Sequence, residues 1–228
     1  MPGLPADFHA GARDVAPTLL AVFPFGIVAG AAAVDVGFSL LQALGMSVIV
    51  IAGASQLAAI AVLGAGAPAV VVVFTALVIN LRHLMYSASL APEYRDEPVR
   101  VRAPVAYLLV DQVFVMAAIK FDADAAVDRR WYYFGLGVPI WLTWVAGTAV
   151  GAVAGAAVPA WLPIEFAVPM VFLALLAPAV DDRPRAVAAV VGGTVAVAGA
   201  GFPLNLGLPA GALGGVLAGV VADSWWSP

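Results

Sequence analysis

Three polar side chains, Asn80, Arg82 and His83, lie inside a segment that otherwise has the composition of a lipid-buried helix. The segment runs from Ala69 to Ala91 as AVVVVFTALVINLRHLMYSASLA and is long enough to cross a bilayer. An arginine near the centre of such a helix costs about 2.5–3.5 kcal/mol on insertion scales. A chain that keeps this charge has usually given it a partner, a water-filled cavity or a substrate. The segment therefore predicts a transport or catalytic path through a membrane protein.

Composition places the whole chain in the membrane. Of its 228 residues 64% are hydrophobic and 11% are charged, whereas soluble domains carry about 25% charged residues. The apolar runs do not alternate every second residue as barrel strands do, so we expect an all-α polytopic helix bundle. The chain has no cysteine and only two histidines, His9 and His83. We therefore expect no metal, no other cofactor and no nucleic-acid partner.

Hydropathy divides the chain into about eight spans, with seven as the alternative. Some of these helices should be kinked or broken, as at Pro24 in span one. The connectors leave no room for a soluble domain, so residues 1–228 are expected to form one transmembrane domain. The predicted spans are 15–34, 41–63, 69–91, 103–121, 132–156, 163–180, 185–203 and 206–222.

Basic residues beside the spans predict the orientation in the cell membrane. With eight alternating spans and a cytoplasmic N-terminus, six basic residues are cytoplasmic. Three others, Arg95, Arg100 and Arg102, are then external and do not fit the rule. The balance still favours a multi-pass plasma-membrane protein with both termini inside.

A short internal echo predicts a repeat. Residues 26–32 read GIVAGAA and residues 151–157 read GAVAGAA, at an offset of 125. Transporters are often built from internal repeats with the binding site between them. The echo favours repeat halves at about 14–121 and 131–222, although Ala/Gly sequences also match by accident.

Further polar residues occupy neighbouring spans. Gln56 lies in span two and Asp111 in span four, at about the same predicted depth as Arg82. Consecutive spans are usually adjacent, so an Arg82–Asp111 pair is expected. A purely structural ion pair is one explanation. The additional polar groups around it, including His83 and Tyr86, favour a binding site instead.

Three motifs resemble the AzlC-type branched-chain amino acid permeases. They are FPFGIVAG at residues 23–30, AGASQLAA at residues 52–59 and NLRHLMYSASLAP at residues 80–92, and the similarity continues through VDQ at residues 110–112 and FAVPMVFLALLAP at residues 166–178. The resemblance implies the large subunit of an exporter that works with a small AzlD-type membrane subunit. It carries substrate-binding roles to Gly53, Ser55, Gln56, Asn80, Arg82, His83, Tyr86 and Asp111.

The chain departs from the family pattern at one point, because Val110-Asp111-Gln112 stands where the family commonly has Thr-Asp-Glu. Asp111 would then be the only acid available for proton coupling. The small residues of the 185–222 segment favour close helix contacts, either with the small subunit or in a homo-oligomer.

Three classes of function remain open. The first is a secondary transporter of hydrophobic amino acids, driven by an ion or substrate gradient because the chain has no nucleotide-binding loop. In this class the protein is not an enzyme. The second is an intramembrane serine hydrolase that uses Ser55 and His83, although Gln56 stands where rhomboid-type proteases have glycine. The third is a channel or a structural subunit.

Overall fold

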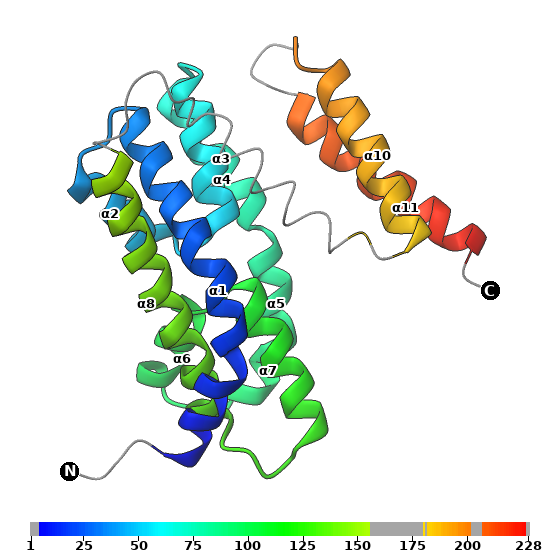
Figure 1. Cartoon of the computed structure of the whole chain (residues 1–228). Coiled ribbons are helices and arrows are strands. Elements are labelled where there is room, and N and C mark those ends of the chain that lie inside the picture. The colour runs from blue at the N-terminus through cyan, green and yellow to red at the C-terminus, as the bar shows by residue number, and fades with distance from the viewer. Residues whose placement is uncertain (1–4, 156–179, 181, 202–206, 227–228) are drawn as a thin grey trace. The chain divides into compact units, whose positions relative to one another are not determined.

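The computed structural model describes residues 5–155, 180, 182–201 and 207–226, and these residues form two compact units. The first unit is Met1–Val168 and the second is Pro169–Pro228. The described residues are helical and contain no strand, which confirms the all-α membrane class with broken helices (Figure 1). Most of the predicted span at 163–180, and the 166–178 motif within it, lie outside the described residues.

The helices of the two units follow one another with short connections. The first unit contains α1 (Ala6–Asp35), α2 (Leu40–Val50), α3 (Gly53–Gly64), α4 (Ala69–Asn80), α5 (Arg82–Leu90), the 3₁₀ helix η1 (Ala91–Tyr94), α6 (Val99–Tyr107), α7 (Asp111–Ala123) and α8 (Arg129–Gly155). The second unit contains α10 (Arg183–Ala198) and α11 (Gly207–Trp226).

The two longest helices, α1 and α8, pack side by side and run in the same direction (Figure 1). Gly11 contacts Gly135 near their beginnings, and Gly30 contacts Ala152 near their ends. We call the end of the first unit where α1 and α8 begin the basic end, because Arg13, Arg129 and Arg130 lie there. The opposite end is called the far end.

Small residues let α1 and α8 approach until their backbones touch. A methyl group on Gly26 would lie 3.0 Å from the carbonyl oxygen of Trp144, and one on Gly151 would clash with the carbonyl oxygen of Ile27. Glycines at four-residue spacing permit such contact between membrane helices. The glycines of the GIVAGAA segment and those at 151 and 155 in the GAVAGAA segment therefore supply the two faces of one helix contact. The predicted repeat halves stay a prediction.

We expect Gly151→Leu to destabilise the first unit by about 3 kcal/mol or more, the upper range for overpacked sites. The reason is that the added side chain meets backbone atoms of α1, which cannot rotate away. The matched control is Gly45→Leu in α2, because a Cβ atom there meets no atom within 4 Å. Thermal unfolding in detergent, followed by tryptophan fluorescence, measures both variants. Equal stability of the two would show that α1 and α8 do not pack through Gly151.

Helices α2 and α3 form a hairpin that enters and leaves the first unit at the far end. Helix α2 begins with a capping box between Ser39 and Gln42 and stops at Ile51. Ile51 has a φ of 38°, a left-handed conformation that costs a non-glycine residue about 1–2 kcal/mol. Helix α3 then returns, so that Gly64 lies against Val36, just beyond the end of α1.

Helices α6 and α7 form a second hairpin, which enters and leaves at the basic end (Figure 1). Helix α6 runs parallel to α8, because the Tyr133 hydroxyl donates to the Val105 carbonyl and Leu108 packs on Gly137. Helix α7 runs back, and the ring of Phe121 lies 6.3 Å from that of Tyr132. The segments 41–63 and 103–121, predicted as single crossings, are therefore each a helical hairpin.

Among the described residues, three helical stretches are long and apolar enough to cross a membrane: Ala6–Asp35, Ala69–Tyr94 and Arg129–Gly155. The middle stretch joins α4, α5 and η1 and is interrupted at Leu81. It begins next to the far end and finishes at the basic end, where Glu93 forms an ion pair of 2.8 Å with Arg129. The arginines at 95, 100 and 102 follow directly, so they lie at the end where α1 and α8 begin. The prediction that they lie on the side opposite the N-terminus is wrong.

The second unit is an antiparallel hairpin of α10 and α11. Asp182 caps α10 by accepting from the Arg185 amide at 2.7 Å. Gly192 of α10 contacts Gly211 and Gly215 of α11, so these three glycines are used for contact within the hairpin. These two helices correspond to the predicted spans 185–203 and 206–222.

Candidate functional site

Three helices begin in the middle of the first unit. Helix α3 begins at Gly53, at the tip of one hairpin, and α7 begins at Asp111, at the tip of the other. Helix α5 begins at Arg82, where the middle apolar stretch, Ala69–Tyr94, is interrupted. The first turn of a helix has unbonded N–H groups and a positive dipole end, which favour anions. The fold thus gathers groups that bind negative charge at mid-depth.

The two hairpins meet at their tips. Tyr107, at the end of α6, donates its hydroxyl to the carbonyl of Val48 in α2 at 2.6 Å. Trp141 of α8 donates its indole N–H to the same hydroxyl at 2.9 Å. Val48 belongs to the last turn of α2, whose carbonyls have no partner within the helix. Tyr107 therefore joins the hairpin from the basic end to the hairpin from the far end.

Arg82 and Asp111 form the ion pair that the sequence predicted. Arg82 Nη1 lies 2.9 Å from Asp111 Oδ2, and the two side chains are 30% and 39% exposed. The pairing places a positive and a negative group on the first residues of α5 and α7, in the predicted neighbouring positions. The remaining exposure leaves room for a third group at the pair.

Several polar atoms around this pair are buried and have no hydrogen-bond partner among the described residues. They are Asn80 Oδ1, Arg82 Nε, His83 Nε2 and Asp111 Oδ1. An unsatisfied buried polar atom costs about 1–3 kcal/mol, so native structures rarely contain one without a reason. Four of them on neighbouring residues indicate a site that a polar ligand or water completes.

Aromatic rings form one wall of the same site. The His83 and Tyr86 rings meet edge to face at 5.9 Å, and Tyr86 stacks on Phe114 at 4.4 Å. Tyr86 is also within electrostatic range of both Arg82 and Asp111. Phe114 was missed by the sequence analysis, although its position three residues after Asp111 puts it on the same helix face.

Two other predicted site residues have their polar groups occupied elsewhere. The Gln56 amide donates to the Ser47 hydroxyl at 2.8 Å, and Ser47 donates to Thr148 at 3.0 Å. The Ser55 hydroxyl donates to the carbonyl of Ala52 at 3.0 Å. Ser47, Ser55, Gln56 and Thr148 are all 0% exposed. This buried network ties the α2–α3 hairpin to α8, and sequence reasoning missed its members Ser47 and Thr148 because single hydroxyls in apolar runs carry little signal.

Gly53 has a packing role at the tip of α3. A side chain there would meet the rings of Phe25 and Trp144, which lie 5.5 Å apart. A serine nucleophile finds no support in the first unit, because Ser55 is buried and no described contact joins it to His83.

A known protein family matches the sequence of most of the first unit. The model of the AzlC protein family matches residues 17–158, which include both hairpins and the ion pair. The chain belongs to the AzlC family. The match confirms the resemblance that the residue 23–30, 52–59 and 80–92 motifs indicated.

Relatives of the chain include other AzlC-type membrane proteins. It is 28% identical to the inner membrane protein YgaZ of Escherichia coli, over 96% of this chain and 92% of the relative. It is 30% identical to an uncharacterized membrane protein of Archaeoglobus fulgidus, over 96% of this chain and 95% of the relative. It is also 30% identical to the branched-chain amino acid transport protein AzlC of Bacillus subtilis, over 66% of this chain and 60% of the relative. No solved structure matches the chain.

Proposed function

We propose that this protein is the large subunit of a secondary transporter that exports branched-chain amino acids across the cell membrane, and that it is not an enzyme. The observation that carries the proposal is the Arg82–Asp111 pair with unpartnered polar atoms beside it. A relative named as a branched-chain amino acid transport protein supports the substrate class.

An amino acid zwitterion complements this pair. Its carboxylate matches the Arg82 guanidinium, which binds carboxylates through two parallel hydrogen bonds. Its ammonium matches the Asp111 carboxylate, and its polar atoms supply partners for Arg82 Nε and Asp111 Oδ1. The substrate replaces one direct ion pair by two new ones, so the buried charges stay neutralised.

The same carboxylate offers a way to couple export to protons. Asp111 holds either a substrate ammonium or a proton, because protonation removes the charge that attracts the ammonium. Competition for one site links outward movement of amino acid to inward movement of protons. No second acid is needed, which fits the glutamine at position 112.

Counterflow in proteoliposomes tests the proposed function. Vesicles with the purified chain and loaded with unlabelled leucine should accumulate labelled leucine, isoleucine and valine, and addition of a small AzlD-type membrane subunit should raise the rate. The control is an empty vesicle at the same lipid composition. Absence of amino acid counterflow, with and without the subunit, would contradict the proposal.

The hairpins also support a cytoplasmic N-terminus. The basic end carries every lysine and arginine of the first unit except Arg82: Arg13, Arg95, Arg100, Arg102, Lys120, Arg129 and Arg130. The sequence from residue 31 to 79, which includes the far-end hairpin, contains none. Lysine and arginine accumulate on the cytoplasmic side, so we assign the basic end to the cytoplasm.

Single-cysteine labelling tests this orientation, because the natural chain has no cysteine. In intact cells a membrane-impermeant maleimide should label Ala65→Cys, at the far end, and should label Asp96→Cys only after permeabilisation. Eight alternating spans with the same N-terminus predict the reverse pattern. Labelling of Asp96→Cys in intact cells would therefore contradict the assignment of the basic end to the cytoplasm.

A further inference from the structure

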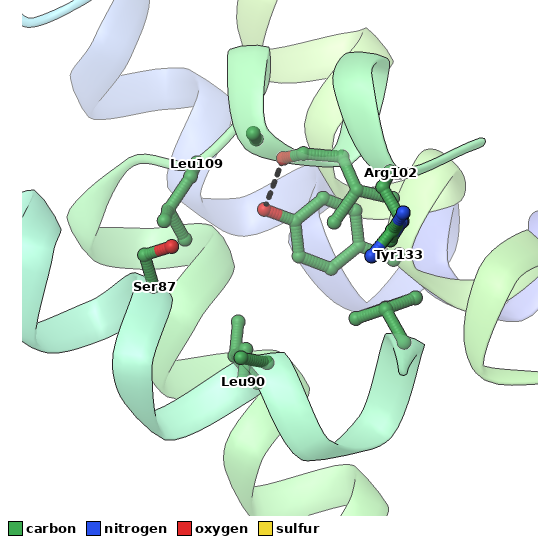
Figure 2. A pocket seen from close by; sticks show the side chains of 9 residues that line it. Ser87, Leu90, Arg102, Leu109 and Tyr133 are labelled. Atoms are coloured by element: carbon green, nitrogen blue, oxygen red, sulfur yellow. Dashed lines mark hydrogen bonds between the residues drawn. The ribbon is translucent and has the colours of Figure 1, made fainter. Parts of the chain in front are cut away.

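A partly open cavity of about 170 Å³ lies between α5, α6 and α8 in the first unit. Figure 2 shows Ser87, Leu90 and Leu109 on one side of it and Tyr133 facing them. Its wall is mainly apolar, and Val105 completes it where its carbonyl accepts from Tyr133 at 2.9 Å. Apolar cavities of about 150 Å³ bind a molecule as large as benzene. The cavity therefore has the size and character for a branched aliphatic group.

Two residues of the cavity wall lie a short way along the chain from the ion-pair residues. Ser87 follows His83 by four residues on α5, so the two side chains lie one turn apart on the same helix face. Leu109 precedes Asp111 by two residues, in the break between α6 and α7. One turn of helix spans about 5.4 Å, which is within reach of the side chain of an amino acid held at Arg82 and Asp111.

We propose that this cavity holds the aliphatic side chain of the transported amino acid and sets its size preference. The inference rests on the proposed function. It assigns recognition of the substrate side chain to the residues that line the cavity, which are separate from the ion-pair residues Arg82 and Asp111. The aliphatic group loses contact with water there, which supplies affinity in proportion to its apolar area.

Filling the cavity tests the inference through a preference, not through total activity. Ala106→Leu and Ala91→Leu each add three carbons to its wall. A misfit of one methylene changes discrimination by about 10- to 200-fold, so the leucine-to-alanine counterflow ratio should fall at least about tenfold in both variants. The matched control, Ala88→Leu, lies on the exposed part of α5 and should keep the natural ratio.

The outcomes separate this inference from the proposed function. A natural protein that moves no amino acid overturns the proposed function. A natural protein that moves amino acids, with an unchanged ratio in both filled variants, overturns the cavity assignment. Leu109→Ala provides a second readout, because enlarging the cavity should raise the rate of phenylalanine counterflow relative to that of leucine.

Arg102 also lines the cavity and offers a competing position for the substrate carboxylate. Arg102→Gln should lower the apparent affinity for leucine far less than Arg82→Gln does, because Arg82 binds the carboxylate. A loss as large as that of Arg82→Gln would place the whole amino acid in the cavity and overturn the assignment.

Discussion

Replacement of Arg82 by glutamine is expected to lower the affinity for leucine by at least about 30-fold. Losing one partner of a buried, hydrogen-bonded charge pair costs about 2–5 kcal/mol, and the low end of this range applies here because the two side chains are partly exposed. Each 1.4 kcal/mol corresponds to about tenfold. The guanidinium, which lies 2.9 Å from Asp111, is the proposed carboxylate ligand. Equilibrium binding of labelled leucine to the purified protein measures the change.

Two controls separate this binding loss from loss of folding. Arg95→Gln removes an exposed arginine at the basic end and should bind leucine like the natural chain. The double variant Arg82→Gln/Asp111→Asn leaves no unpaired charge, so it should fold as well as the natural protein and still not bind. Natural affinity in Arg82→Gln would remove Arg82 from the site.

Replacement of Asp111 by asparagine is expected to abolish the dependence of transport on a proton gradient. Asparagine keeps the shape of the side chain and cannot bind or release a proton in the physiological range. Efflux from vesicles with an imposed pH gradient, compared with vesicles at equal pH, measures the coupling. In the natural protein the gradient should accelerate efflux, and in Asp111→Asn the two rates should be equal.

Asp124→Asn is the matched control for that variant. Asp124 pairs with Lys120 at 3.0 Å, and this hydrogen bond holds the pKa of the exposed Asp124 carboxyl below its usual value. It lies at the end of α7, away from the ion pair at its start, so its loss should leave coupling intact. Proton-driven efflux that persists in Asp111→Asn would show that another group carries the proton.

The ion pair was predictable from the sequence because its cost is local. A charge in an apolar run demands compensation, and Arg82 and Asp111 were opposite charges in neighbouring segments. The two residues were predicted to lie at about the same depth, and the ion pair between them confirms this. The AzlC motif was equally visible, because the spacing of asparagine, arginine and histidine is preserved in residues 80–83.

The hairpins were not predictable from hydropathy. A window over residues 41–63 has the same composition whether the chain crosses once or turns back at Ile51, because both arrangements bury the segment. The turn depends on one left-handed residue and on the Ser47–Gln56 bond across it. The basic residues of the 92–102 connector were the available signal. They conflict with the positive-inside rule when the segment 41–63 crosses once, and they agree with it once that segment turns back.

Gln56 illustrates a second limit. Its amide required partners in an apolar segment, and sequence reasoning assigned those partners to the substrate. The partner is Ser47, which in turn donates to Thr148, and the three residues became neighbours only through the folding of α2 against α3 and α8. A buried polar residue indicates a satisfied hydrogen bond, and the sequence does not distinguish a ligand from another side chain.

Binding of two leucine analogues tests most directly whether the Arg82–Asp111 pair holds a zwitterion. Isoamylamine lacks the carboxylate, and 4-methylpentanoate lacks the ammonium. We expect Arg82→Gln to weaken the binding of 4-methylpentanoate strongly and that of isoamylamine little. We expect Asp111→Asn to weaken the binding of isoamylamine strongly and that of 4-methylpentanoate little. Variants that weaken the binding of both analogues equally, or of neither, would contradict the assignment of one charge of the substrate to each residue.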